Sequence, residues 1–136
     1  MEAKIWGPHA WIFLHSITMA YPENPTEQDK KDYTNFFTNL HTILPCSICK
    51  THYKDNLKKI PIQLNNRKEL VNWLINIHNS VNKSNNKKQY SYQEVINYYD
   101  RLYHNSSLKY IIIISVIVIG TYFLIKKYRK VLKKML

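Results

Sequence analysis

Apolar side chains recur every three or four positions through most of residues 1–107, which is the period of one face of an α-helix. The first such face follows Trp6-Gly7-Pro8 and is closed by Pro22. A second helix is predicted to open with Thr26 as its N-cap and with acids in its first turn. The apolar positions are Trp11, Leu14, Ile17, Thr18 and Tyr21 in the first helix, and Tyr33, Phe36, Phe37, Leu40, Ile43 and Leu44 in the second.

Two more helices are predicted in the middle of the chain. A short one begins at Cys46 and runs through Leu57. The next opens on Asn66 and Glu69, which are spaced like a capping box, and the polar, lysine-rich segment 82–89 after it is expected to be a loop. The apolar stripe of this helix consists of Leu70, Trp73, Leu74, Ile77 and Val81.

The sequence Ser91-Tyr92-Gln93-Glu94 is a capping box and opens a fifth helix. Its buried side is expected to consist of Val95, Ile96, Tyr99, Leu102 and Tyr103. No alternating strand pattern competes with these helices, and the chain has only two glycines, which argues against a turn-rich β architecture. The pattern therefore predicts an all-α bundle of about five helices connected by short loops.

The carboxyl-terminal segment has a different pattern. Residues 108–125 carry a single charge, and residues 126–136 carry six lysines and arginines and no acid. A helix of eighteen residues is just long enough to cross the apolar core of a bilayer, and Tyr110 and Tyr122 suit its interfaces. The run is much too long for a buried strand, which is the alternative. We therefore predict a globular domain over 1–107, one transmembrane helix over 108–125 and a basic tail over 126–136.

The net charge of +11 lies mostly in this tail. Residues 1–107 hold thirteen bases and nine acids without a basic stripe interleaved with aromatics, so a nucleic-acid binder is not supported. No signal peptide is predicted, because the amino terminus lacks an apolar core. The cations after the apolar run favour a cytoplasmic carboxyl terminus, which would place the domain on the other side of the membrane. The missing signal peptide favours the opposite orientation, with a cytoplasmic domain anchored by its tail. Of the two orientations, the one with the cytoplasmic domain is preferred.

Cys46 and Cys49 are the only cysteines in the chain. Two thiols three positions apart at the start of a helix can close as a reversible disulfide, and the helix start favours the thiolate. Three chemistries remain open: redox exchange, zinc binding if His15, His41 or His52 completed the shell, and an inert pair of thiols. Redox exchange is favoured, because a second half-site for zinc is not recognisable.

A second group of chemically informative residues lies at the end of the fourth predicted helix. His78 and Asn82 lie one helical turn apart beside the apolar stripe, and more polar residues and lysines follow. Such a group indicates either ordinary polar caps or a polar rim around a large planar ligand that carries phosphates. Trp11 and His15, also one turn apart, would add a stacking wall and a hydrogen-bonding group. A dithiol that cycles needs an electron acceptor, and side chains cannot carry two electrons to oxygen, so a cofactor is expected.

Together these motifs resemble the Erv/ALR family of FAD-linked sulfhydryl oxidases, in particular its short viral members. The resemblance covers residues 6–103 and rests on the order and spacing of several elements. It implies a four-helix bundle with a short fifth helix that holds FAD, usually as a non-covalent homodimer. The matching elements are Trp6-Gly7 with Trp11 and Leu14-His15, then Tyr21-Pro22, then Pro45-Cys46-x-x-Cys49, then His78-Asn79-x-Val81-Asn82 with Lys87 and Tyr90.

The resemblance also implies roles for individual residues. Cys46 would exchange disulfides with the substrate, and Cys49 would face the flavin. Gly7 would allow close approach of the backbone to FAD, and Tyr90 would pack against the adenine or the ring edge of the cofactor. The other residues around FAD would be Trp11, His15, His78, Asn79 and Asn82, with Lys83 and Lys87 at its phosphates.

The activity that the resemblance implies is the formation of disulfides in dithiol protein substrates. Electrons would pass from Cys46 and Cys49 to FAD and on to molecular oxygen to give hydrogen peroxide, for the disulfides of viral proteins. The additional shuttle and structural cysteines of many family members are missing, and Tyr92 stands where one of the structural cysteines is expected. The substrate is therefore expected to reach Cys46 directly. A membrane-anchored zinc-binding module or a flavin-free dithiol relay is the alternative.

Overall fold

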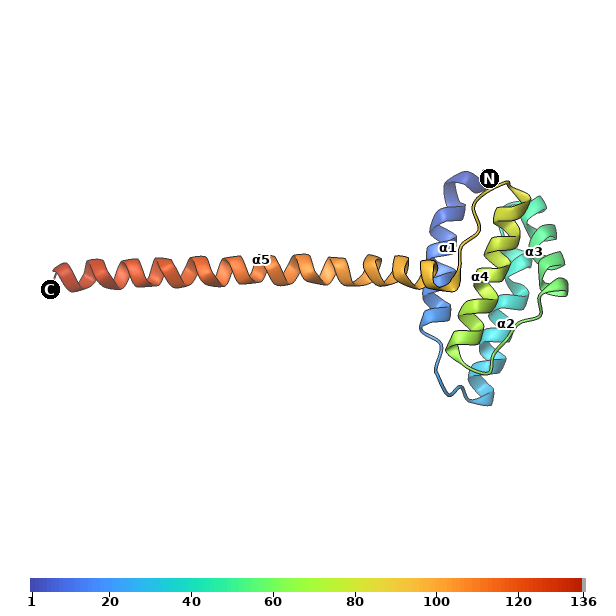
Figure 1. The fold of residues 1–136 in the computed structure, drawn as a ribbon, viewed down its shortest axis with the longest axis horizontal. Coiled ribbons are helices and arrows are strands. Elements are labelled where there is room, and N and C mark those ends of the chain that lie inside the picture. The colour runs from blue at the N-terminus through green and yellow to red at the C-terminus, as the bar shows by residue number, and fades with distance from the viewer. Residues whose placement is uncertain (136) are drawn as a thin grey trace. The chain divides into compact units, whose positions relative to one another are not determined.

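The computed structural model describes the backbone of residues 1–135 and the side chains of residues 1–103 and 109–130. All regular structure in this part of the chain is helical (Figure 1), which confirms the predicted all-α fold. Two compact units, Met1–Tyr92 and Gln93–Leu136, are described separately. The helices are α1 (Ala3–Met19), α2 (Glu27–Ile43), α3 (Ser47–Lys59), α4 (Arg67–Ser84) and α5 (Tyr92–Met135).

Polar side chains cap the starts of α2 and α4, as the sequence predicts. Thr26 accepts a hydrogen bond from the Asp29 amide at 3.1 Å, and the Asp29 carboxylate accepts one from the Thr26 amide at 2.8 Å. At α4, Asn66 Oδ1 accepts from the Glu69 amide at 2.9 Å. Such caps satisfy amides that the first helical turn leaves without a partner, and each contributes about 1 kcal/mol.

Two helix ends differ from the prediction. α1 begins at Ala3, ahead of Pro8, because a proline so close to a helix start removes only one backbone hydrogen bond from the frayed end. α4 continues to Ser84, so the first part of the predicted loop 82–89 is helical. The chain leaves the helix where Asn86 takes a φ of 54°, a left-handed conformation that asparagine tolerates and that commonly follows a helix end.

α4 carries most of the core of the first unit. Phe37 of α2 packs edge-on against Trp73 with ring centroids 5.0 Å apart, and Trp73 Nε1 donates to the Ile60 carbonyl at 2.9 Å. The predicted stripe is confirmed except at Val81, which is only half-buried, and two residues beside the stripe are buried in addition. The buried apolar side chains of α4 are Leu70, Val71, Trp73, Leu74, Ile75 and Ile77.

The apolar face predicted for α2 is buried only in part. Phe37 is fully buried, whereas Phe36 is 37% and Ile43 75% exposed. Ile43 is the last residue of α2, and apolar periodicity cannot show at which turn the neighbouring helices stop covering a face. The remaining members of the face, Tyr33, Leu40 and Leu44, pack against the core.

α1 runs antiparallel to α4. In the second half of α1, His15 Nε2 lies 3.1 Å from His78 Nδ1. Just past the end of α1, the Tyr21 carbonyl accepts from Arg67 Nε, at the start of α4, at 2.6 Å. A later position at α1 thus meets an earlier position on α4, so the start of α1 lies beside the end of α4.

α3 also runs antiparallel to α4. Ser80 donates to Asn56 Oδ1 at 2.9 Å, whereas Trp73 reaches back to Ile60, just past the end of α3. The start of α3 therefore lies toward the end of α4. As Figure 1 shows for this unit, the starts of α1 and α3 and the end of α4 gather at one end of the bundle.

The second unit consists of the remainder of α5, which continues without a break into the apolar segment. The fifth helix is thus not a short separate element, because the sequence after Tyr92 has no proline and only one glycine, Gly120, to interrupt it. Leu102 and Tyr103, which were expected to be buried, are 42% and 49% exposed. Periodicity identifies the apolar face of a helix but does not show along how much of its length that face is buried. The stretch Lys109–Lys130 is long and apolar enough to cross a membrane, by length and composition.

Candidate active site

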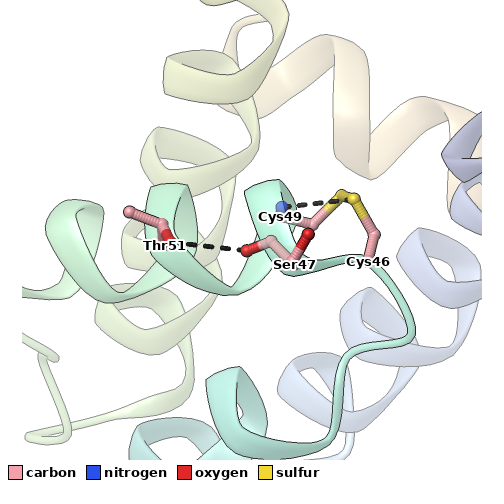
Figure 2. The surroundings of a disulfide bond; sticks show 4 residues. All are labelled: Cys46, Ser47, Cys49 and Thr51. Carbon is pink, nitrogen blue, oxygen red and sulfur yellow. Dashed lines mark hydrogen bonds between the residues drawn. A yellow bond between two sulfur atoms is a disulfide. The ribbon is translucent and has the colours of Figure 1, made fainter.

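Cys46 and Cys49 form a disulfide at the first turn of α3 (Figure 2). Cys46 is the extended N-cap of this helix, which begins one residue later than predicted, and its Sγ accepts a hydrogen bond from the Cys49 amide at 3.3 Å. Both cysteines are half-buried. The amide and the helix start would stabilise a negative charge on Cys46 Sγ once the disulfide opens. The geometry is therefore suited to reversible thiol–disulfide exchange.

Lys50 is the nearest cation in the sequence to the disulfide. Its amine donates to the Thr42 carbonyl at 2.7 Å, at the end of α2. This bond satisfies one of the carbonyls that a helix end leaves without a partner, and it ties α2 to the first turn of α3. The short connection that carries Cys46 is thereby fixed between two helices.

Trp11, His15 and His78 form a contiguous aromatic group between α1 and α4. The Trp11 and His78 rings are stacked, with centroids 3.8 Å apart and planes within 6° of each other. His15 is buried, and its Nε2 shares a hydrogen bond with His78 Nδ1. The structure thus brings together side chains from two helices, although His15 and His78 are 63 positions apart in the sequence.

Both imidazoles of this group are held in the neutral form. Burial, reinforced by the charge of His78, lowers the pKa of His15 to about 3. Burial, reinforced by the charge of Lys87, lowers the pKa of His78 to about 4. Near neutral pH each ring therefore has one nitrogen that donates and one that accepts.

Asn79 and Asn82 fasten the segment after α4 onto the end of that helix. The Asn79 side chain donates to the Tyr90 carbonyl at 2.8 Å and accepts from the Tyr90 amide at 2.9 Å. Asn82 is buried, and its backbone carbonyl accepts a hydrogen bond from the Lys87 backbone amide at 2.8 Å. The predicted residues Lys87 and Tyr90 are thus held beside Asn82 and Asn79, and Lys83, Lys87 and Tyr90 are exposed.

The antiparallel helices assemble these residues at one end of the first unit. Gly7 comes from the start of α1, the disulfide from the start of α3, and the segment 78–90 from the end of α4 and beyond. A Cβ added at Gly7 would have no atom within 4 Å apart from its chain neighbours and the nearby backbone of its own helix, so the chain itself leaves space there. The described residues contain no group of three or more His, Cys, Asp or Glu placed to hold a metal ion.

Known proteins are similar to this chain in sequence. The model of the Erv1 / Alr family matches residues 8–101. A probable FAD-linked sulfhydryl oxidase of Acanthamoeba polyphaga mimivirus is 42% identical over 99 residues, which cover 71% of this chain and 69% of that protein. A FAD-linked sulfhydryl oxidase of African swine fever virus is 35% identical over 104 residues, which cover 76% of this chain and 84% of that protein. The chain belongs to the Erv1/Alr family.

A solved family member has the same helical fold. The crystal structure of the yeast Erv1 core superposes with a TM-score of 0.67 at 27% identity, and the match covers 76% of this chain and 84% of that chain. The Erv/ALR-like fold predicted from the sequence is thereby confirmed. The family match at 8–101 contains every predicted site residue except Gly7, and it ends before the apolar stretch of α5.

Three residues near the site were not singled out from the sequence. Trp6 was noted only as part of a motif, yet its indole Nε1 is buried and has no hydrogen-bond partner among the described residues. Ile43 and Ile48 flank the disulfide and are 75% and 65% exposed. A sequence signal existed for Ile48, because it lies between the cysteines and belongs to no apolar stripe.

Proposed function

We propose that this member of the Erv1/Alr family is a FAD-dependent sulfhydryl oxidase that forms disulfides in dithiol protein substrates. The observation that carries the proposal is the Cys46–Cys49 disulfide at the start of α3, in a unit whose helices α1 and α4 also bring Trp11, His15 and His78 together. The two viral relatives compared above are named as FAD-linked sulfhydryl oxidases.

The exchange reaction would take place at Cys46. A substrate thiolate attacks Cys46 Sγ, the bond to Cys49 breaks, and its electron pair leaves with Cys49 as a thiolate. A second substrate thiolate then attacks the substrate sulfur of the mixed disulfide, and Cys46 leaves as a thiolate. The substrate loses two electrons and gains a disulfide, while the pair in the enzyme becomes a dithiol. The Cys49 amide, which already bonds Cys46 Sγ, would stabilise the departing Cys46 thiolate.

Residues of α1, of α4 and of the segment after α4 fit an FAD. The cofactor offers flat ring systems, ring carbonyls and ring nitrogens, and two phosphates. The stacked Trp11 and His78 rings and the neutral imidazole of His15 match the first two features, and the unpaired, buried Trp6 Nε1 is a free donor in the described part of the chain. Exposed lysines match the phosphates. We assign Trp11, His15, His78, Asn79, Asn82 and Tyr90 to the ring systems, and Lys83 and Lys87 to the phosphates.

When bound, FAD would supply the two-electron chemistry that side chains lack, taking electrons from the reduced pair and passing them to oxygen to give hydrogen peroxide. The protein's own task is to hold Cys46 and Cys49 at the start of α3 and to keep both imidazoles neutral beside the cofactor. Positive charge on His15 or His78 is disfavoured by their burial.

The proposal extends to assembly and location. We propose that the chain is anchored by a single pass of α5, with the first unit on the cytoplasmic face, that it forms a non-covalent homodimer, and that it serves the disulfides of viral proteins. Support comes from the apolar stretch Lys109–Lys130, none of whose side chains is buried, and from the viral source of two relatives.

The full chain, purified in detergent, tests the proposed function in one preparation. We expect the visible absorption of bound flavin, no stoichiometric zinc, and oxygen consumption with peroxide formation when dithiothreitol is added. A colourless protein that carries zinc would support the zinc-binding alternative. Thiol–disulfide exchange without oxygen consumption would support the flavin-free relay.

Replacing Gly7 by alanine separates the stability of the fold from cofactor binding. Because an added Cβ would have no atom within 4 Å beyond its chain neighbours and the nearby helix backbone, the Gly7→Ala chain without FAD is expected to be more stable by about 0.5–1 kcal/mol, the helix preference of alanine over glycine. If the backbone at Gly7 approaches FAD closely, the same methyl group will weaken FAD binding. Chemical unfolding of the apoprotein and fluorescence titration with FAD measure the two effects. Unchanged FAD affinity would remove Gly7 from the cofactor site.

A further inference from the structure

Two large aliphatic side chains flank the disulfide without contributing to the core. Ile43 ends α2 and is 75% exposed, and Ile48 lies between the cysteines and is 65% exposed. Each is at most three residues from Cys46, so their Cα atoms lie within about 11 Å of it. A single exposed isoleucine is ordinary on a protein surface, but two that bracket the reacting sulfur are in place to be covered whenever a partner approaches it.

Covering these side chains would contribute to binding rather than to folding. Burial of an isoleucine contributes about 1.5–3 kcal/mol relative to leaving it exposed. Folding gains little of this free energy at Ile43 and Ile48, because most of each residue remains in contact with solvent.

The charge around these isoleucines is positive. Lys50 and Lys54 lie among the first eight residues of α3, which contain no acid, whereas Asp55 and Lys58, whose carboxylate and amine lie 3.7 Å apart, and Lys59 lie toward the other end of that helix. The acids of α2 all lie at or near the start of that helix, away from the disulfide. A segment that approaches the disulfide therefore meets an apolar pair with the cations Lys50 and Lys54 beside it.

We propose that Ile43 and Ile48 form a docking surface for the substrate polypeptide, and that they select a segment with apolar residues on both sides of its attacking cysteine and acidic residues beyond them. The proposal rests on the proposed function, because it assigns the substrate of the same dithiol. Since the isoleucines lie on either side of Cys46 in the chain, an apolar residue on each side of the substrate cysteine would meet one of them. Docking would hold the substrate sulfur near Cys46 Sγ and would discriminate substrates through affinity.

The test compares peptide binding and turnover in the full chain. One peptide has a dithiol flanked by leucine and aspartate, a second has serine and lysine at those positions, and binding is measured by fluorescence anisotropy with serine in place of the peptide cysteines. The Leu/Asp peptide is expected to bind the wild type at least about ten-fold more tightly than the Ser/Lys peptide, and the Ile43→Ser/Ile48→Ser double variant is expected to lose about ten-fold or more of that affinity. In the double variant, the ratio of kcat/KM for the Leu/Asp peptide to kcat/KM for dithiothreitol should fall together with the peptide affinity.

Phe13→Ser is the matched control, because Phe13 is 59% exposed on α1 and has not been assigned to the site. It should leave peptide affinity as in the wild type. Equal affinity of the double variant and the wild type for the Leu/Asp peptide, or equal affinity of the wild type for both peptides, would overturn the docking surface. Selective binding by a chain that oxidises neither dithiothreitol nor peptide would instead retain the docking surface and overturn the oxidase function.

Discussion

Replacing either Cys46 or Cys49 by serine is expected to reduce peroxide formation from dithiols by at least about a thousand-fold. A serine hydroxyl cannot form the disulfide through which electrons leave the substrate, and the described residues contain no second cysteine pair to replace it. Because the two sulfurs act as one unit, the double variant should lose no more activity than either single variant. The measurement is the rate of peroxide release with dithiothreitol as the substrate, in the purified full chain.

Two controls show whether a loss of activity comes from the missing sulfur. Flavin absorption should persist in both variants, which shows that the loss lies in thiol chemistry and not in cofactor binding. Ser47→Ala, a neighbouring change that removes no sulfur, should keep most of the activity. Peroxide formation that survives in either cysteine variant would mean that electrons reach oxygen by another path, and the proposed mechanism would be wrong.

The same variants distinguish the roles of the two sulfurs. Cys46 Sγ already accepts the Cys49 backbone amide, and this amide remains when residue 49 is serine. The remaining thiol of Cys49→Ser should therefore react faster with an aromatic disulfide reagent near neutral pH than the remaining thiol of Cys46→Ser. The reverse order would assign the exchange with substrate to Cys49.

Acid is expected to destabilise the first unit through the His15 and His78 pair. The folded pKa values of about 3 for His15 and about 4 for His78 lie below the ordinary histidine value of 6.5, because burial disfavours the charged rings. At a pH between the folded and the unfolded pKa values, the unfolded chain binds more protons than the folded chain. The contribution of the neutral histidines to the free energy of unfolding is therefore fully present above about pH 6.5. It is lost as the pH falls through the range from 6.5 to about 3. At about 1.4 kcal/mol per pKa unit, the two shifts correspond to a loss of up to about 8 kcal/mol for the pair.

Unfolding by guanidinium at several pH values, followed by tryptophan fluorescence, measures this dependence. All three tryptophans, Trp6, Trp11 and Trp73, lie in the first unit, so the signal reports on the right part of the chain. The His15→Gln/His78→Gln variant should show a flatter dependence of the unfolding free energy on pH than the wild type. His52→Gln, at an exposed position, is the control and should keep the wild-type slope. Equal slopes in all three proteins would show that the pair does not titrate as described.

The helices and their caps were largely predictable from the sequence, because both depend on local interactions. Thr26 and Asn66 act as N-caps at the predicted positions, and the apolar stripe of α4 is buried as its spacing predicts. Errors occurred at helix ends and at edges of faces. Pro8 lies inside α1, because the helix tolerates the loss of one backbone hydrogen bond there. Ile43 lies on the surface, because its burial depends on whether a neighbouring helix covers it.

The sequence by itself determined the lone dithiol, the helical class and the family, since each is carried by residue types at fixed spacing along the chain. Only the tertiary structure decided that α1 and α3 both run antiparallel to α4, which gathers residues from three distant segments at one end. It also decided that Asn79 holds the Tyr90 backbone and that both imidazoles are neutral. The physical reason is that burial and hydrogen-bond partners come from residues far away in the chain, whereas periodicity reports only on neighbours.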